Sequence, residues 1–133
     1  MQEKHLFEYA VIRVVPRVER EEFLNVGVVL FCKGQDFLQA RCNLDEKRMA
    51  AFAPETDPDE IRESLRAFCE ISKGSNGSGP IGKLDQASRF RWLTAARSTV
   101  VQTSKVHPGF CTDAGDMLEK LFKEQVAASL RSQ

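Results

Sequence analysis

Side chains that could act as nucleophiles or metal ligands are few and widely spaced in the sequence. The two histidines, His5 and His107, lie far apart and belong to no set of ligands at the spacings that zinc uses. Cys111 follows His107 by four residues in H-P-G-F-C, so an imidazole could activate a thiolate there. Pro108 and Gly109 more commonly form a turn, with the cysteine packed under a helix. We therefore expect no catalytic residue, no metal and no cofactor, and the sequence favours a protein that is not an enzyme.

The four cysteines indicate a reducing environment. Cys32, Cys42, Cys69 and Cys111 include no C-x-x-C pair, and three of them lie among apolar neighbours. The N-terminal residues MQEKHLFEY lack the features of a signal peptide, and no apolar run approaches the ~20 residues of a membrane-spanning helix. We expect four free thiols in a cytoplasmic protein without a membrane segment.

Positive charge is concentrated in one part of the chain. The sequence has 19 Lys and Arg against 19 Asp and Glu, so the whole molecule has no net field that would attract nucleic acid or a membrane. Residues 83–107 contain five positive side chains and one negative, against 14 and 18 elsewhere. Four of the five would form a binding surface: Arg89, Arg91, Arg97 and Lys105.

The segment SRFRWLT is predicted to place these charges on a sheet. Its alternation puts Arg89 and Arg91 on one side of a strand and Phe90 and Trp92 on the other. Guanidinium groups at that spacing can bind phosphate or carboxylate. Because the aromatic rings would face the core, they are not available to stack on bases, so nucleic acid is an unlikely ligand. A solvated polar sheet face remains the alternative.

The elements that would position these residues begin with two strands that are apolar on both faces. YAVIRVVP (9–16) and EFLNVGVVLF (22–31) have the pattern of central strands, whereas FLQARCNL (37–44) alternates between apolar and polar residues. A three-residue loop at 34–36 would pair Cys32 with Leu38 and Val28 with Cys42, so that every pair on that face is apolar. In this register Gly27 leaves a gap on the second face, rimmed by three polar side chains: Asn25, Asn43 and Arg41.

Helices and two further strands complete the prediction. Residues 45–53 and 57–74 have N-terminal capping aspartates, and residues 113–130 have an apolar helical stripe. Residues 75–82 have the composition of a flexible loop, and SRFRWLT and STVVQTSKV are predicted strands. The sequence therefore predicts a single α+β domain over residues 1–133. It would have a mostly antiparallel sheet of four to five strands and about three helices, the last packed on the sheet.

Three segments in this order, YAVIRVVP, EFLNVGVVLF and RFRWLTAARSTVVQTSKVHPG, resemble an uncharacterised bacterial family catalogued as domain of unknown function 3037. The N-V-G and R-F-R motifs carry the likeness, which extends from about Tyr9 to the final helix. The resemblance implies no catalytic residues. It implies a partner, because members of the family are often encoded beside kinase-like proteins of the HipA type.

Two functions therefore compete. The first is a non-enzymatic interaction or accessory module that binds a partner protein through the basic sheet face. The second is a small nucleotide- or phosphate-binding domain, or an enzyme, that uses the gap at Gly27 and the nearby arginines. The lack of a recognisable nucleophile, base or metal site favours the first.

Overall fold

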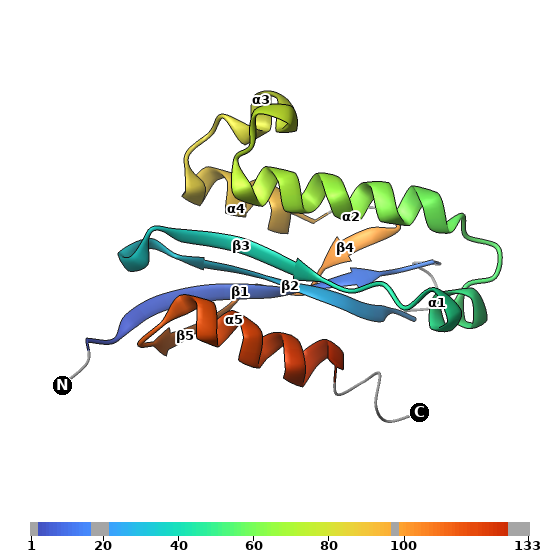
Figure 1. Ribbon diagram of the computed structural model, residues 1–133, viewed down its shortest axis with the longest axis horizontal. Helices are drawn as coiled ribbons and strands as arrows, with labels where there is room; N and C mark the ends of the chain where they lie inside the picture. Colours follow the sequence, from blue (N-terminus) through green and yellow to red (C-terminus); the bar gives the residue numbers. More distant parts are fainter. Residues whose placement is uncertain (1–2, 17–21, 97–98, 128–133) are drawn as a thin grey trace.

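A five-stranded sheet lies between helices in the computed structural model, which describes residues 3–16, 22–96 and 99–127 (Figure 1). The strands are β1 (His5–Val14), β2 (Leu24–Cys32), β3 (Phe37–Cys42), β4 (Val101–Thr103) and β5 (His107–Cys111). Their order is β3-β2-β1-β4, β5 also pairs with β1, and every pairing is antiparallel. This confirms the predicted α+β class with a mostly antiparallel sheet.

One long edge of β1 is shared by two short strands. β4 pairs with its second half, where Ile12 lies opposite Thr103, and β5 pairs with its first half, where Tyr9 lies opposite His107. Ser104 connects the two ladders. Its backbone N–H donates to the carbonyl of Val11 at 2.8 Å, and its hydroxyl accepts from the Val11 N–H at 2.8 Å. The backbone groups of β1 thus stay paired across the irregularity between β4 and β5.

Helices cover both faces of the sheet. They are α1 (Glu46–Phe52), α2 (Pro58–Lys73), α3 (Gly79–Gly82), α4 (Gln86–Thr94) and α5 (Ala114–Phe122), and a π-helical turn at Lys123–Ala127 continues α5. Figure 1 shows α2 and α4 on one face and α5 on the other. Two buried clusters result, one under α2 and α4 and one under α5. Because both faces are covered, β1 and β2 need apolar residues on both, as the sequence predicts.

Capping residues set the bounds of the predicted helices. The Asp45 carboxylate accepts from the backbone N–H of Arg48 at 3.1 Å, and Asp57 precedes Pro58 at the start of α2. α2 ends at Gly74, whose φ of 69° is left-handed, the conformation that glycine adopts most readily. α1, α2 and α5 are the three predicted helices. Among the described residues none of the helices is long and apolar enough to span a membrane.

Residues 75–94 differ from the prediction. The expected flexible loop contains a 3₁₀ turn at Asn76–Ser78 and the short helix α3. The expected strand SRFRWLT is helix α4, capped by Asp85, whose carboxylate accepts from the Ser88 N–H at 2.8 Å. Phe90 and Leu93 are both buried, and a spacing of three residues puts them on one face of a helix.

The predicted register of the β2–β3 hairpin is wrong. The connection has four residues, with a 3₁₀ turn at Lys33–Gln35 followed by Asp36 in the left-handed region, and Cys32 pairs with Phe37. Val28 therefore lies opposite Arg41, which the prediction excluded as a burial of charge. β3 is an edge strand, and Arg41 extends to solvent with its side chain about half exposed. Long charged side chains can cover apolar surface in this way while their charge stays hydrated.

Candidate functional site

Arg89 is buried and acts as a structural residue. Its Nη1 donates to the carbonyls of Ile71 at 3.1 Å and Ser72 at 2.8 Å, and its Nε donates to the carbonyl of Leu84 at 3.0 Å. The first two carbonyls belong to the last turn of α2, where the N–H groups of a following helical turn are missing, and Ile71 also accepts from the Gly74 N–H at 3.1 Å. The guanidinium therefore ties α4 to the end of α2, and the prediction of Arg89 as a surface binding residue is wrong.

The other positive residues do not form the predicted sheet face. Arg91 is exposed on α4, two residues beyond Arg89, and on a helix that spacing turns it to a different side. Lys105 is exposed in the segment between β4 and β5. Arg97 lies outside the described residues. Arg89 and Arg91 share a helix instead of a strand, so the basic sheet face does not exist as predicted.

The gap predicted at Gly27 is filled. Gly27 lies opposite Cys42, and a Cβ at Gly27 would come within 2.6 Å of the Arg41 carbonyl oxygen and 2.9 Å of Cys42 Sγ. The missing side chain therefore makes room for the neighbouring strand and its thiol. No space remains there for a ligand, which removes the geometric basis of the nucleotide- or phosphate-binding alternative.

Asn25 and Arg41 point to the α5 side of the sheet instead of lining that gap. Arg41 Nε lies 2.9 Å from Glu119 Oε1, and its guanidinium carbon lies 4.7 Å from the centre of the Phe122 ring. Asn25 Nδ2 donates to the carbonyl of Gln125 at 3.1 Å. Both residues hold α5 and its π-helical extension on the sheet. The predicted set of Asn25, Gly27 and Arg41 is therefore not brought together as a site.

The possible Cys–His pair is also not assembled. His107 and Cys111 both belong to β5, and four residues of extended strand separate their Cα atoms by about 13 Å. The His107 ring packs against Tyr9, with 5.3 Å between ring centres. Cys111 is buried in the cluster under α5, as the sequence predicts, although the Pro108–Gly109 segment is strand and not turn. Within the described ranges no three His, Cys, Asp or Glu side chains gather where they could hold a metal ion.

An open cavity of about 960 Å³ lies between α4 and the sheet. We call it the α4 groove. It is bounded by the first residues of β1, by the β2–β3 connection and by the N-terminal half of α4. Phe31 contributes to its floor, and Phe31 packs on Phe90 of α4 with 5.6 Å between ring centres. α4 therefore forms one wall and is anchored on the sheet beside the groove.

Charges of both signs line the α4 groove. Lys4, Lys33 and Arg91 are positive, and Glu8, Asp36 and Asp85 are negative. The pKa of Asp85 is lowered, chiefly by hydrogen bonds from the backbone and hydroxyl of Ser88 and to a smaller extent by Arg91 and Arg89. Asp85 therefore stays ionised at neutral pH. A mixed lining of this kind suits a polypeptide with polar and apolar groups better than a polyanion.

Leu6 lines the edge of the α4 groove, and a second large exposed apolar side chain lies beside it on the sheet. Leu6 of β1 and Phe110 of β5 are directly paired across the strands, with 56% and 66% of their surface exposed. Paired residues of antiparallel strands share a face, so the two side chains form one apolar patch. The sequence prediction missed them because it began β1 at Tyr9 and treated Pro108 and Gly109 as a turn. The aromatic residues Phe7 and Tyr9, two positions apart and continuous with the apolar run that follows, were the available signal for a longer β1.

A family model described as protein of unknown function (DUF3037) matches residues 9–126. No curated protein and no solved structure matches the chain. The matched span includes Arg91, Phe110 and most of the α4 groove, while Leu6 lies just before it.

Proposed function

Because the chain belongs to the DUF3037 family, whose members are of unknown function, its role must be argued from its surface, and we propose that it is a non-enzymatic interaction module. It binds a partner protein through the α4 groove and the adjoining Leu6–Phe110 patch. The partner that the family resemblance suggests is a kinase-like protein of the HipA type. The exposure of Leu6 and Phe110 on one sheet face is the observation that carries the proposal.

The chemistry of this surface supports a protein as ligand. Adjacent exposed aromatic and aliphatic side chains keep apolar area in contact with water. This contact is unfavourable until another surface covers the patch. Aromatic residues and arginine are enriched among the residues that dominate protein–protein binding energies. Phe110 supplies the aromatic side chain, next to Leu6, and Arg91 in the lining of the groove supplies the arginine. Charged residues around the patch would select the partner and its orientation.

Replacing Phe110 with aspartate is expected to weaken binding of the HipA-type protein about 30-fold, because an apolar anchor that binding buries typically contributes about 2 kcal/mol or more. Titration calorimetry with the purified partner measures this change. Phe110 is largely exposed, so the melting temperature should stay within about 3 °C of the unmodified protein.

Leu84→Asp is the matched control, because Leu84 is also exposed, at 44%, and does not line the α4 groove. It should bind like the unmodified protein. Equal affinity of the Phe110→Asp variant, or an equal loss in the Leu84→Asp variant, would place the binding surface elsewhere. If the unmodified chain does not bind the HipA-type protein at all, that choice of partner is wrong.

A further inference from the structure

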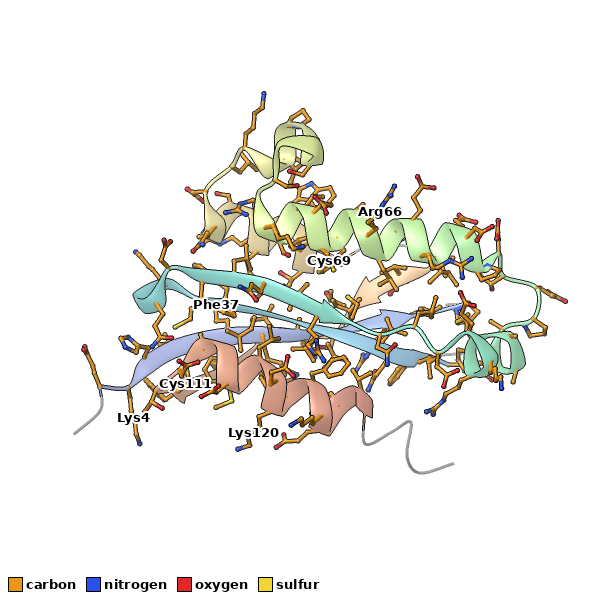
Figure 2. The ribbon with its side chains drawn as sticks, in the orientation of Figure 1. Lys4, Phe37, Arg66, Cys69, Cys111 and Lys120 are labelled. Carbon is orange, nitrogen blue, oxygen red and sulfur yellow. The ribbon has the colours of Figure 1, made fainter. Side chains whose placement is uncertain are left out.

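Two thiols meet between the sheet and the helix that covers it. Cys42 at the end of β3 and Cys69 in α2 have their sulfur atoms 3.7 Å apart. Figure 2 shows Cys69 on the side of α2 that faces β3, while Cys111 lies near α5 on the opposite side of the sheet. Both residues of the pair are partly exposed, whereas Cys32 and Cys111 are buried. All four cysteines are free thiols in the structure, as the sequence predicts.

The local fold holds the pair in place. Gly27 lies opposite Cys42, and its missing side chain lets Cys42 Sγ lie against β2. Cys69 lies on the boundary of the buried stripe of α2, next to Phe68, so its sulfur faces β3 without being fully enclosed. A partly exposed thiol beside a positive group, here Lys73, is a usual setting of a reactive cysteine.

The two sulfurs differ in acidity. A hydrogen bond from Cys42 lowers the pKa of Cys69 to about 7, with help from Lys73, against the opposing effects of burial and Glu70. The same hydrogen bond, together with burial, raises the pKa of Cys42. At neutral pH about half of Cys69 is therefore thiolate, whereas Cys42 stays protonated and acts as the proton donor. An ionised thiol beside a protonated one is the arrangement found in dithiols that react in sequence.

We propose that Cys42 and Cys69 are a reversible oxidation site, in which Cys69 reacts with a hydroperoxide and Cys42 then closes a disulfide. A disulfide needs sulfur atoms about 2.05 Å apart. The observed separation of 3.7 Å requires an approach of about 1.7 Å, which side-chain rotation can supply. The product would link the edge strand β3 to α2.

The reaction balances in two steps. The Cys69 sulfur attacks one oxygen of hydrogen peroxide, an S–O bond forms, and the O–O bond breaks. The departing hydroxide takes a proton and becomes water, leaving a sulfenic acid on Cys69. The Cys42 sulfur then attacks the Cys69 sulfur, the S–O bond breaks, and the second hydroxide takes the Cys42 proton. Two thiols lose two electrons and two protons, the peroxide becomes two waters, and a thiol reductant reverses the change.

Thiol counting on the full chain tests the proposal. After brief treatment with hydrogen peroxide at pH 7 and removal of the oxidant, the unfolded protein should show two free thiols in place of four. Trypsin cuts after Arg41, Lys47, Arg66 and Lys73, so Cys42 and Cys69 fall in the separate peptides CNLDEK and AFCEISK. Mass spectrometry should find these peptides joined and two hydrogen atoms lighter than their sum, and a thiol reductant should separate them.

Two single variants distinguish the roles of the sulfurs. Cys42→Ser should stop at the sulfenic acid, which dimedone labels on Cys69. Cys69→Ser should keep its three remaining thiols, because the Cys42 thiol stays protonated. The matched controls are Cys32 and Cys111, which lie near each other in the α5 cluster, where burial and the neighbouring Cys32 raise the pKa of Cys111. A Cys32–Cys111 link, or four surviving thiols under conditions that oxidise free cysteine, would overturn the proposal.

The pH dependence of alkylation independently tests whether Cys69 is the reactive sulfur. The rate at which iodoacetamide labels Cys69 should rise through a midpoint near pH 7 and level off above about pH 8, whereas an ordinary thiol would still gain reactivity at pH 9. The groups that act on Cys69 are Cys42 on β3 and Glu70 and Lys73 on α2. Lys73→Gln should move the midpoint upward and Glu70→Gln downward. A midpoint at the value of free cysteine would contradict the assignment of Cys69 as the reactive sulfur.

Discussion

Replacing Arg89 with alanine is expected to lower the free energy of unfolding by about 3 to 4 kcal/mol. The guanidinium donates three hydrogen bonds to the carbonyls of Ile71, Ser72 and Leu84, and its first two acceptors are buried. Removing it takes a charged donor from buried carbonyls in a site that water does not easily reach, and only Ile71 keeps a second bond, from the Gly74 N–H. Bonds from a charged donor are the costly ones to lose. For a chain of this length the melting temperature should fall by about 10 °C or more.

Two further variants test the cause of that loss. Arg91→Ala removes an exposed arginine from the same helix and should change the free energy of unfolding by no more than about 0.5 kcal/mol. Arg89→Lys keeps the charge but lacks the planar fork that reaches two elements at once, so it should recover only part of the stability. An Arg89→Ala variant as stable as the Arg91→Ala variant would show that the link between α2 and α4 contributes little.

A methyl group at Gly27 is expected to destabilise the fold by about 2 to 3 kcal/mol. The added Cβ would lie 2.6 Å from the backbone oxygen of Arg41 and 2.9 Å from Cys42 Sγ. A side chain could move away, but the carbonyl belongs to the paired β2–β3 ladder, so relief requires the strands to separate. Chemical denaturation of the Gly27→Ala variant measures the loss.

Gly77→Ala is the matched control, because a Cβ there would meet nothing within 4 Å. It should change the free energy of unfolding by no more than about 0.5 kcal/mol. Equal stability of the two variants would mean that β2 and β3 can shift apart without cost. The Gly27→Ala variant should bind the partner normally once it is folded, because the filled gap is no ligand site; a selective loss of binding would restore the gap as a candidate.

The central strands could be predicted because their pattern has one physical cause. A strand needs apolar residues on both of its faces only where both faces of the sheet are covered. β1 and β2 meet that condition. The ends of α1 and α2 could be predicted from their capping residues for a similar reason. A side chain that satisfies free backbone N–H groups acts locally, and the rest of the fold does not change its role.

The α4 segment could not be assigned from its alternation. In SRFRWLT the aromatic residues alternate with arginines over only four positions, which fits a strand of period two. The buried residues are Arg89, Phe90 and Leu93, which fit a helix packed on two neighbours. Arg89 can be buried because carbonyls of α2 accept its hydrogen bonds. The sequence does not show that these acceptors lie near Arg89. The Asp85 cap was the local signal for a helix.

The hairpin register and the α4 groove could not be predicted from the sequence for a related reason. The register rule assumed that β3 has one dry and one wet face, but Arg41 lies over Phe122 of α5 and still reaches water. The groove combines residues of β1, the β2–β3 connection and α4, and the adjoining patch pairs Leu6 with Phe110 of β5. Which side chains meet there depends on strand order and register together. Neither can be obtained from one sequence.

The pairing of β1 with β4 and β5 sets the order in which the chain can fold. β1 and β2 are close in sequence and can form a hairpin early, but the bond between Val11 and Ser104 spans 93 residues. Contacts between distant residues slow folding, because a long loop must close before they form. During synthesis one edge of the apolar strand β1 therefore stays unpaired until residues 101–111 have emerged. In that interval the nascent chain exposes an unpaired strand edge, and chaperone binding would favour correct folding over aggregation.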